Sequence, residues 1–229
     1  MALVTETGAP IEKVLLAVPC GDQVAAGFAQ DLATLYAFTT YARPDTELAL
    51  YFLRGTYLPR ARAGLVQAAI DRCASHILWL DSDMRFPKDT LLRLLAHGRS
   101  IVAANYPTRT APIVPTAVDG QRLEVFERVD VVLQDVKYCG MGCMLTATDV
   151  FLTIGKPWFA VGYNRGADDY AGEDVFFCQK ARENNYSILI DPALSEQVRH
   201  VGSFEYGMDH ARMTLEAARV AQATKGAGG

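Results

Sequence analysis

The stretch HILWLDSDM, residues 76–84, decides the fold that we predict for this chain. Its first five residues form a short apolar run, which is typical of a strand buried in a sheet. The run ends in two aspartates that are separated by one residue. In open α/β sheets, ligands bind beyond the carboxyl ends of the strands. The stretch therefore predicts a core strand over residues 76–84 and a functional site at its carboxyl end.

Strand and helix patterns alternate on both sides of this stretch. Apolar runs predict further strands at 13–19, 47–53, 100–107 and 187–192. Helical periodicity or flanking signals predict helices at 22–42, 62–75, 89–97, 147–154 and 173–184. The alternation predicts an α/β domain with a mixed, mostly parallel sheet and helices on both faces.

Turn signals and position in the chain predict the structure of the remaining segments. Residues 110–142 are turn-rich, with an Asp-Gly turn at 119–120, and predict two antiparallel strands. Residues 156–172 predict a long polar and aromatic loop. Residues 1–10 predict a loose tail, residues 11–205 the domain, and residues 206–229 a surface helix, from 208 to about 223, followed by a tail.

Composition limits the function classes. The chain has 229 residues, half of them hydrophobic, which fits one globular domain. A formal net charge of -4 argues against nucleic-acid binding by the whole surface, although Arg54, Arg60 and Arg62 are close enough in sequence to build a local basic groove. No apolar run has the length of a membrane span, and the N-terminal residues lack the basic and apolar pattern of a signal peptide, so we expect none here.

The five cysteines predict reduced thiols. Their odd number and spread suggest a cytosolic protein, which would be the host cytoplasm for a virus-encoded chain. Cys139 and Cys143 lack a second Cys/His pair at a spacing suited to zinc. We therefore expect them to pack as small residues in a tight segment.

The acidic pair predicts a cation site. In extended chain, residues i and i+2 face the same side, so Asp81 and Asp83 would aim two carboxylates at one point. A divalent cation relieves their repulsion and can then grip a diphosphate. The alternative is a solvated acidic loop, which is common after strands.

Three segments in order resemble the GT-A fold glycosyltransferases, in particular compact family-2-like members of bacterial or bacteriophage type. They are ARAGLVQAAIDRCASHILWLDSDM at 61–84, CGMGCMLTATDVF at 139–151 and GEDVFFCQKARENNYSILIDP at 172–192. The likeness extends over roughly residues 13–203. It implies transfer of a sugar from a nucleoside-diphosphate donor to an acceptor hydroxyl.

The resemblance assigns a metal site. It makes Asp83 the metal ligand, places Asp81 on the donor ribose or on a metal-bound water, and lets His200 complete the metal shell. A mixed carboxylate and imidazole set favours Mn²⁺ over Mg²⁺. His200 as an ordinary surface or core histidine is the competing interpretation.

The resemblance also assigns the acid–base group. Asp174, with Glu173 beside it, is the expected general base of an inverting enzyme. Both residues also suit the start of a helix, where carboxylates satisfy free N–H groups. That setting predicts a lowered pKa for Asp174.

On the donor side the resemblance points to Arg62 and Pro19, with a UDP-sugar as the expected donor. One feature departs from the family pattern. Residues 52–56, after the second strand, contain no carboxylate to read a uracil base.

The acceptor side is assigned to Gly140, Gly142, Trp158 and Tyr170. Glycines permit a close approach of the backbone to a ligand, and aromatic rings stack on sugars or bases. The alternatives are that the glycines only form a tight turn and that Trp158 only anchors the loop in the core. The acceptor is a glycan precursor, a small molecule or a hydroxymethylated pyrimidine in viral DNA.

Two other function classes use similar features. A nucleotidyltransferase would share the carboxylate–metal–diphosphate chemistry, but residues 18–24 contain one glycine and no Lys or Arg. A non-catalytic nucleotide-binding module would keep the fold without turnover.

Overall fold

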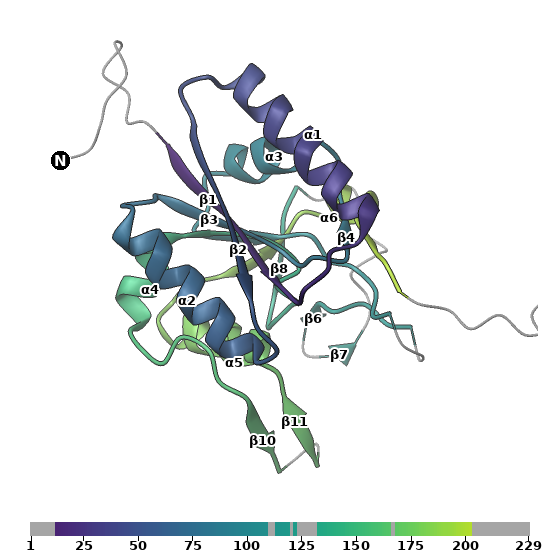
Figure 1. The fold of residues 1–229 in the computed structure, drawn as a ribbon. Coiled ribbons are helices and arrows are strands. Elements are labelled where there is room, and N and C mark those ends of the chain that lie inside the picture. The colour runs from purple at the N-terminus through teal and green to yellow at the C-terminus, as the bar shows by residue number, and fades with distance from the viewer. Residues whose placement is uncertain (1–11, 110–112, 120, 123–131, 166–167, 203–229) are drawn as a thin grey trace, which may run out of the picture.

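A seven-stranded sheet runs through the middle of the molecule (Figure 1). The structure is a computed structural model that describes residues 12–109, 113–119, 121–122, 132–165 and 168–202. The strand order is β2-β1-β3-β9-β5-β12-β8, in which β8 and β9 run against the other five. The strands are β1 Lys13–Cys20, β2 Glu47–Arg54, β3 His76–Leu80, β5 Ile101–Ala103, β8 Gln134–Val136, β9 Cys143–Ala147 and β12 Ile188–Ile190.

Helices cover both faces of this sheet. Alternate residues of β1 enter different cores: Leu15 and Ala17 pack on one face, Leu16 and Val18 on the other. The first face carries α2 Leu58–Asp71, α4 Thr148–Ile154 and α5 Glu173–Glu183. The second face carries α1 Ala26–Ala42, α3 Thr90–Ala96 and the short α6 Pro192–Ser195. The predicted fold class, a mixed and mostly parallel α/β sheet with helices on both faces, is confirmed.

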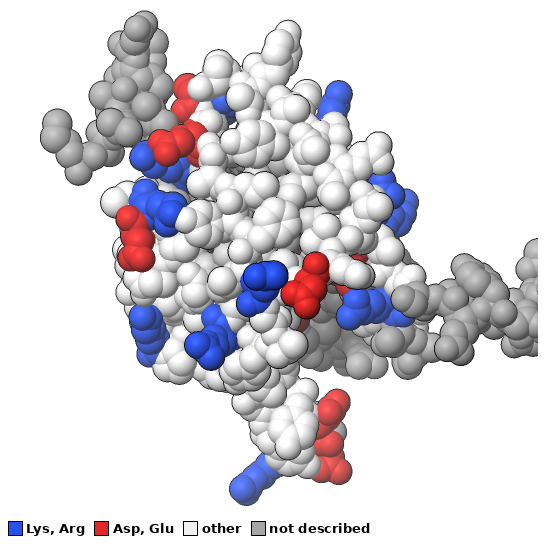
Figure 2. Space-filling view, in the orientation of Figure 1, with Lys and Arg blue, Asp and Glu red and all other residues white. Residues whose placement is uncertain are grey.

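Three two-stranded ribbons complete the fold. They are β4 Met84–Arg85 with β13 Arg199–His200, β6 Val118–Asp119 with β7 Gln121–Arg122, and β10 Gly162–Asn164 with β11 Asp169–Ala171. The β10–β11 hairpin projects from the body of the molecule (Figure 2). Residues 156–172, predicted to be a loop, therefore contain a hairpin. The β6–β7 pair flanks the predicted Asp-Gly turn.

Strand β9 corrects the predicted topology. It lies between β3 and β5 and runs antiparallel to both. Its sequence, Cys143–Ala147, is a five-residue run for which the sequence predicted no strand. A run this short has no periodicity of its own, so only its neighbours in the sheet define it as a strand.

Several predicted bounds also shift. The strand predicted at 76–84 ends at Leu80, and the strand predicted at 100–107 is only three residues long. Helix α2 begins at Leu58, four residues before its predicted start, with Pro59 in its first turn. Gly98 follows α3 with a φ of 59°, a left-handed conformation that glycine adopts readily at a helix end.

The five cysteines are free. Among the described helices, none has the length and apolarity to cross a bilayer. The predicted tail at 1–10 and the predicted helix within 206–229 lie outside the described residues, and the domain bounds at 11–205 stay a prediction.

Phe151 lies at the centre of the aromatic core on the α2 face, in ring contact with four other aromatic residues: Trp79, Trp158, Phe159 and Phe177. We expect Phe151→Ala to lower the free energy of unfolding by about 3–5 kcal/mol, because it removes a fully buried ring from a packed cluster. Urea denaturation measures this change. The neighbouring Leu152, which is 60% exposed, is the matched control, and Leu152→Ala should change stability by less than about 0.5 kcal/mol. Equal effects of the two substitutions would contradict this description of the core.

Candidate active site

The two aspartates after β3 lie in a turn. The N–H of Met84 donates to the carbonyl of Asp81 at 3.0 Å, which closes the chain on itself directly after Leu80. In such a turn, residues i and i+2 do not face one side as they do in a strand. The Asp81 carboxylate accordingly meets Arg62, whereas the Asp83 carboxylate meets Arg109 and His200. The prediction that both carboxylates aim at one point is wrong.

The structure brings Asp83 and His200 together from distant parts of the chain. His200 Nε2 lies 3.4 Å from Asp83 Oδ2. The short ribbon of β4 and β13 sets this contact, since His200 is paired with Met84, the residue after Asp83. The N–H of Val201 also donates to the Asp83 carbonyl at 2.8 Å. The C-terminal segment is thus tied to the acidic turn through the backbone.

Charge at this contact favours ionised forms. Burial opposes ionisation of Asp83, but the hydrogen bond and charge of His200 and the charge of Arg109 outweigh it and lower the pKa of Asp83. The hydrogen bond to Asp83 raises the pKa of His200, against the opposing effect of burial. The Arg109 guanidinium contacts the same carboxylate oxygen that faces His200. The Asp83 carboxylate is therefore paired with two basic side chains, Arg109 and His200.

The orientation of the His200 ring suits a metal ligand. Its Nδ1 lies 3.0 Å from the carbonyl oxygen of Pro107, which can only accept a hydrogen bond, so Nδ1 carries a proton. Nε2, which faces Asp83, is then the nitrogen with a lone pair to offer in the neutral ring. Within the described residues, no three His, Cys, Asp or Glu side chains form a metal-binding cluster. The protein thus offers two donors here, Asp83 and His200.

Arg62 is buried beneath the acidic turn. Its guanidinium bonds Asp81 Oδ1 at 2.9 Å and Glu173 Oε1 at 3.1 Å, and its side chain is 2% exposed. It also lies over the Trp79 ring, 5.7 Å from the ring centre. Arg62 was expected to face the donor nucleotide. The structure turns it inward instead, where it joins the end of β3 to the start of α5.

Asp174 follows Glu173 at the start of α5. Its carboxylate accepts a hydrogen bond from the N–H of Val175 at 2.7 Å, as expected at a helix start. Burial raises the pKa of Asp174, and the charge of Glu173 raises it further, against the Val175 N–H and the charge of Arg62. The prediction of a lowered pKa is wrong, because desolvation and a like charge outweigh the helix terminus here.

The two glycines of the 139–143 segment accommodate Tyr106. The N–H of Gly142 donates to the buried Tyr106 hydroxyl at 2.7 Å, and a Cβ at Gly142 would lie 2.6 Å from that oxygen. A Cβ at Gly140 would also collide with this hydroxyl. The Gly142 carbonyl in turn accepts from the N–H of Asp81 at 3.0 Å. The glycines thus permit a tight packing that supports the acidic turn.

The other predicted residues lie around this centre at different depths. Pro19 is buried near the end of β1, two positions beyond the Ala17–Trp79 pair and so at the level of Asp81. Trp158 is 5% exposed and donates its indole N–H to the Phe151 carbonyl at 2.9 Å, so it anchors the core. Tyr170 is 71% exposed on the β10–β11 hairpin and contacts Tyr163 edge to face.

Sequence reasoning missed Tyr106 and Arg109. Tyr106 packs edge to face on the His200 ring, with the ring centres 5.4 Å apart, and its hydroxyl reaches Gly142. Both residues follow β5 at its carboxyl end. The rule that singled out Asp81, namely that ligands gather beyond the carboxyl ends of strands, would have pointed to this segment as well.

Comparisons with known proteins agree on the fold alone. No family model matches the sequence, and no curated protein matches it. A solved structure described as "Crystal Structure of A197 from STIV" matches with a TM-score of 0.54 at 11% identity, over 86% of this chain and 96% of that chain. Another, "Crystal structure of S. aureus TarS 1-349", has a TM-score of 0.47 at 14% identity, and the match covers 83% of this chain but only 60% of that one. The second likeness is too weak to support an argument.

Together, the sheet order, the acidic turn after β3 and the first likeness define the class of protein. The chain is an α/β protein with a mixed, mostly parallel seven-stranded sheet between two layers of helices, and it shares this fold with the first of these structures. At such low sequence identity, what this particular chain does must be argued from its own residues.

We expect Arg62→Met to lower the free energy of unfolding by about 3–5 kcal/mol, because it removes a buried cation and leaves the partly buried carboxylates of Asp81 and Glu173 unpaired. Urea denaturation at neutral pH measures the loss. Arg60→Met on the same helix is the control, since Arg60 is exposed, and it should cost less than about 0.5 kcal/mol. A loss below about 1 kcal/mol for Arg62→Met would show that the two ion pairs do not hold the site together.

We expect Asp174→Asn to make the protein more stable than the wild type at neutral pH. The raised pKa means that the folded state penalises the Asp174 charge, and Asn removes that charge. The penalty disappears as pH falls through the folded-state pKa towards the ordinary value of 3.8, so the two proteins should converge in acid. Thermal melts across this pH range check the sign.

Asp149 supplies the control because it is the second residue of α4, as Asp174 is of α5, but it is exposed. Asp149→Asn should instead lose about 0.3–1 kcal/mol, since an exposed carboxylate stabilises a helix N-terminus. A destabilising Asp174→Asn would contradict the electrostatic account of the site.

Proposed function

We propose that this protein transfers a sugar from a nucleoside-diphosphate donor, a UDP-sugar in the first place, to an acceptor hydroxyl with the help of Mn²⁺ or Mg²⁺. The observation that carries the proposal is the contact between Asp83 and His200. One residue follows the central strand β3 and the other comes from the end of the described chain, yet their side chains lie 3.4 Å apart. The β4–β13 ribbon holds these two segments side by side, which supports a functional site.

The donor atoms fit a divalent cation. Asp83 offers a carboxylate oxygen and His200 an imidazole nitrogen whose ring is oriented by the Pro107 carbonyl. Arg109 already places a positive charge on Asp83, so the carboxylate is suited to a cation. Two protein ligands leave coordination positions for a diphosphate. When bound, the cation would neutralise the charge that builds up on the leaving diphosphate.

Asp174 is our candidate for the general base. An ordinary carboxylate is a weak base, and the raised pKa of Asp174 strengthens it. Glu173 next to it is held by Arg62, which also holds Asp81. The same guanidinium thus fixes the base-side helix relative to the acidic turn. A single base without a second nucleophile favours inversion at the anomeric carbon.

The remaining donor and acceptor groups follow the edge of the sheet. Pro19 and Asp81 lie at one level near the carboxyl ends of β1 and β3, where we place the donor nucleoside. Tyr170 projects on the hairpin that leads through Gly172 into Glu173 and Asp174, which suits contact with an acceptor. A glycan precursor and a hydroxymethylated pyrimidine of DNA are the acceptor classes that we propose to test.

The proposal separates the roles of two carboxylates, which can be measured independently. A panel of sugar nucleotides is incubated with the protein and Mn²⁺, and release of free nucleoside diphosphate is followed with each candidate acceptor. Asp83→Asn should abolish the metal-dependent part of nucleotide binding in a thermal-shift assay. Asp174→Asn should keep that binding and lower turnover by about 10²- to 10⁴-fold.

Asp149→Asn serves as the control in both assays and should behave as the wild type. Release of pyrophosphate in place of nucleoside diphosphate would replace the proposal with nucleotidyl transfer. Nucleotide binding without turnover would indicate a binding module. Full activity of Asp174→Asn would remove this residue as the base.

A further inference from the structure

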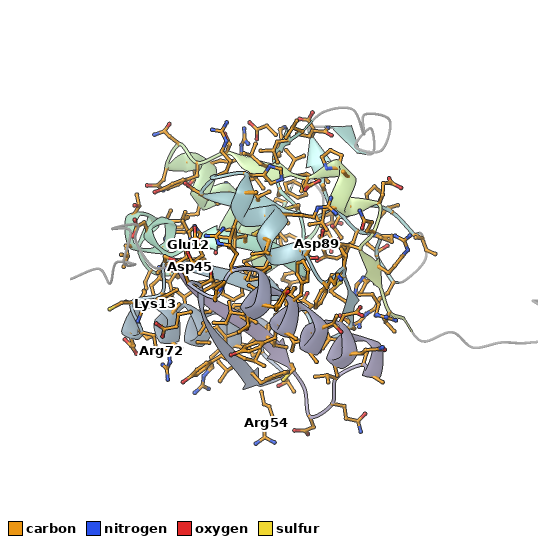
Figure 3. All side chains as sticks on the ribbon, turned by 90° about the horizontal axis from the view of Figure 1, so that it is seen from above. Glu12, Lys13, Asp45, Arg54, Arg72 and Asp89 are labelled. Carbon is orange, nitrogen blue, oxygen red and sulfur yellow. The ribbon has the colours of Figure 1, made fainter. Side chains whose placement is uncertain are left out.

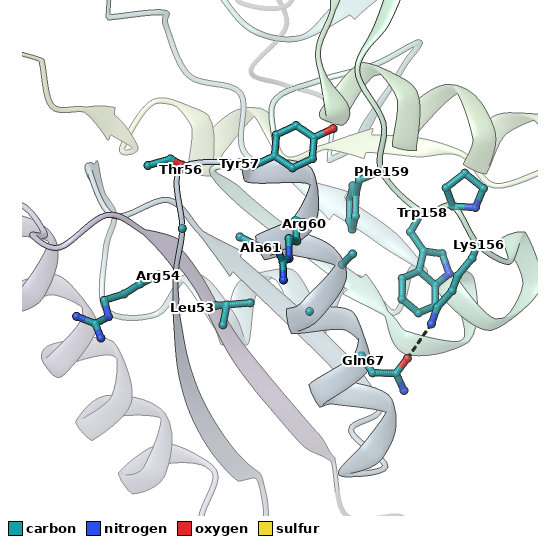
Figure 4. A pocket seen from close by; sticks show the side chains of 14 residues that line it. Leu53, Arg54, Thr56, Tyr57, Arg60, Ala61, Gln67, Lys156, Trp158 and Phe159 are labelled. Carbon is teal, nitrogen blue, oxygen red and sulfur yellow. Dashed lines mark hydrogen bonds between the residues drawn. The ribbon is translucent and has the colours of Figure 1, made fainter.

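A groove runs over the outer side of α2, and its end near β2 adjoins the carboxyl end of β1. Its volume is about 960 Å³. The end of β2 and the following loop form one wall, and residues 156–159 form the other. The close view shows Leu53 and Arg54 on one side of α2 and Trp158 and Lys156 on the opposite side (Figure 4). This volume is in the range of sites that bind sizeable ligands.

Helix geometry separates the groove from the Arg62 network. Residues of an α-helix are spaced by about 100°, so Arg60, Gly64 and Gln67 share one face. Arg62 projects from the opposite face, together with buried residues such as Leu65. The helix therefore stands between the groove and the guanidinium that holds Asp81 and Glu173. Only the end of the groove near β2 adjoins the proposed donor nucleoside, since Leu53 pairs with Pro19.

The groove is basic. Its lining residues, which all belong to the described part of the chain, include Arg54, Arg60 and Lys156 but no Asp or Glu. The Arg60 side chain is exposed and has no ion-pair or hydrogen-bond partner among the described residues. Arg54 has only an exposed pair with Asp22 at 3.6 Å, a contact of little strength. Basic side chains also gather over the region of α2 in the space-filling view.

The end of the groove near β2 adds further features that favour an anion. Arg54 projects beyond the ribbon into solvent when the molecule is seen from above (Figure 3). Helix α2 starts here at Leu58 with no side-chain cap and no acidic residue in its first turn, so its positive end is not compensated. Tyr57, just before the helix, is 59% exposed and offers a ring face.

The cations are spread along the groove. Arg54 and Arg60 lie towards the start of α2, whereas Lys156 Nζ reaches Gln67 Oε1 at 3.0 Å, two turns further on. From Tyr57 to Gln67 the helix rises by about 15 Å. One compact anion cannot contact groups so far apart, but successive phosphates of a chain can. An exposed ring among such cations is the arrangement by which proteins hold unpaired bases.

We propose that this groove binds a segment of single-stranded nucleic acid, with phosphates on Arg54, Arg60 and Lys156 and a base on Tyr57. The binding is local, so it is compatible with the overall net charge of -4. It needs neither the cation nor the donor of the proposed reaction. It therefore goes beyond the proposed function and stands or falls separately from it.

Fluorescence anisotropy of a labelled 12-residue oligothymidylate on the full chain, without divalent cation, tests the proposal. The combined variant Arg54→Gln, Arg60→Gln and Lys156→Gln should lose most of the binding. Arg60→Gln alone should reduce the slope of log affinity against log salt by about 0.7, the value of one phosphate contact on a single strand. Tyr57→Ala should weaken binding by about fivefold or more.

The matched control removes three cations on the other side of the sheet: Arg43→Gln, Lys88→Gln and Arg99→Gln. It changes the net charge by the same amount, and these cations belong to the α1 and α3 face. Thermal melts confirm that both combined variants are folded. Retention of the oligonucleotide by the groove variant, or its equal loss in the control, would overturn the proposal.

Two further probes decide the kind of ligand. A duplex of the same length should bind more weakly than the single strand, because its bases cannot reach Tyr57. Inorganic polyphosphate should compete poorly at equal phosphate concentration. If polyphosphate displaces the labelled strand as well as unlabelled strand does, or if Tyr57→Ala binds with unchanged affinity, the groove recognises charge alone. Either result would overturn the assignment to nucleic acid.

Discussion

The candidate site depends on one buried cation, the guanidinium of Arg62. It bonds Asp81 after β3 and Glu173 at the start of α5, so it joins two segments that are far apart in the sequence. A buried charge is tolerated only when it is paired, and here each partner compensates the others. The relative position of the acidic turn and the helix that carries Asp174 is therefore fixed by electrostatics as much as by packing.

A second layer of contacts orients the groups that face solvent. The Tyr106 hydroxyl packs against Gly142, whose carbonyl holds the N–H of Asp81. The Pro107 carbonyl orients His200, and the β4–β13 ribbon brings that histidine to Asp83. Cations are favoured at Asp83, while the charge of Asp174 is disfavoured, a difference that the proposed cation-binding and base roles require.

Much of the fold could be predicted because burial leaves a mark on the sequence. The continuous apolar runs of β1 and β3 are typical of strands covered on both faces, and the helices between them follow by spacing. Strand β9 was missed because five residues have no period, and its antiparallel course depends on its neighbours β3 and β5. The Asp81–Met84 turn likewise depends on contacts that the local sequence does not show, so the sequence predicted strand there. The predicted direction of the two carboxylates was wrong for that reason.

The sequence by itself determined the class of fold and the place of the acidic residues beyond a central strand, because hydrophobic periodicity and strand ends are local properties. The roles predicted for Asp83, His200 and Asp174 came from the family resemblance. Only the tertiary structure decided that Arg62 turns inward, that Arg109 meets Asp83, and that burial raises the pKa of Asp174. Those outcomes depend on desolvation and on partners distant in the chain, which no local pattern of residues records.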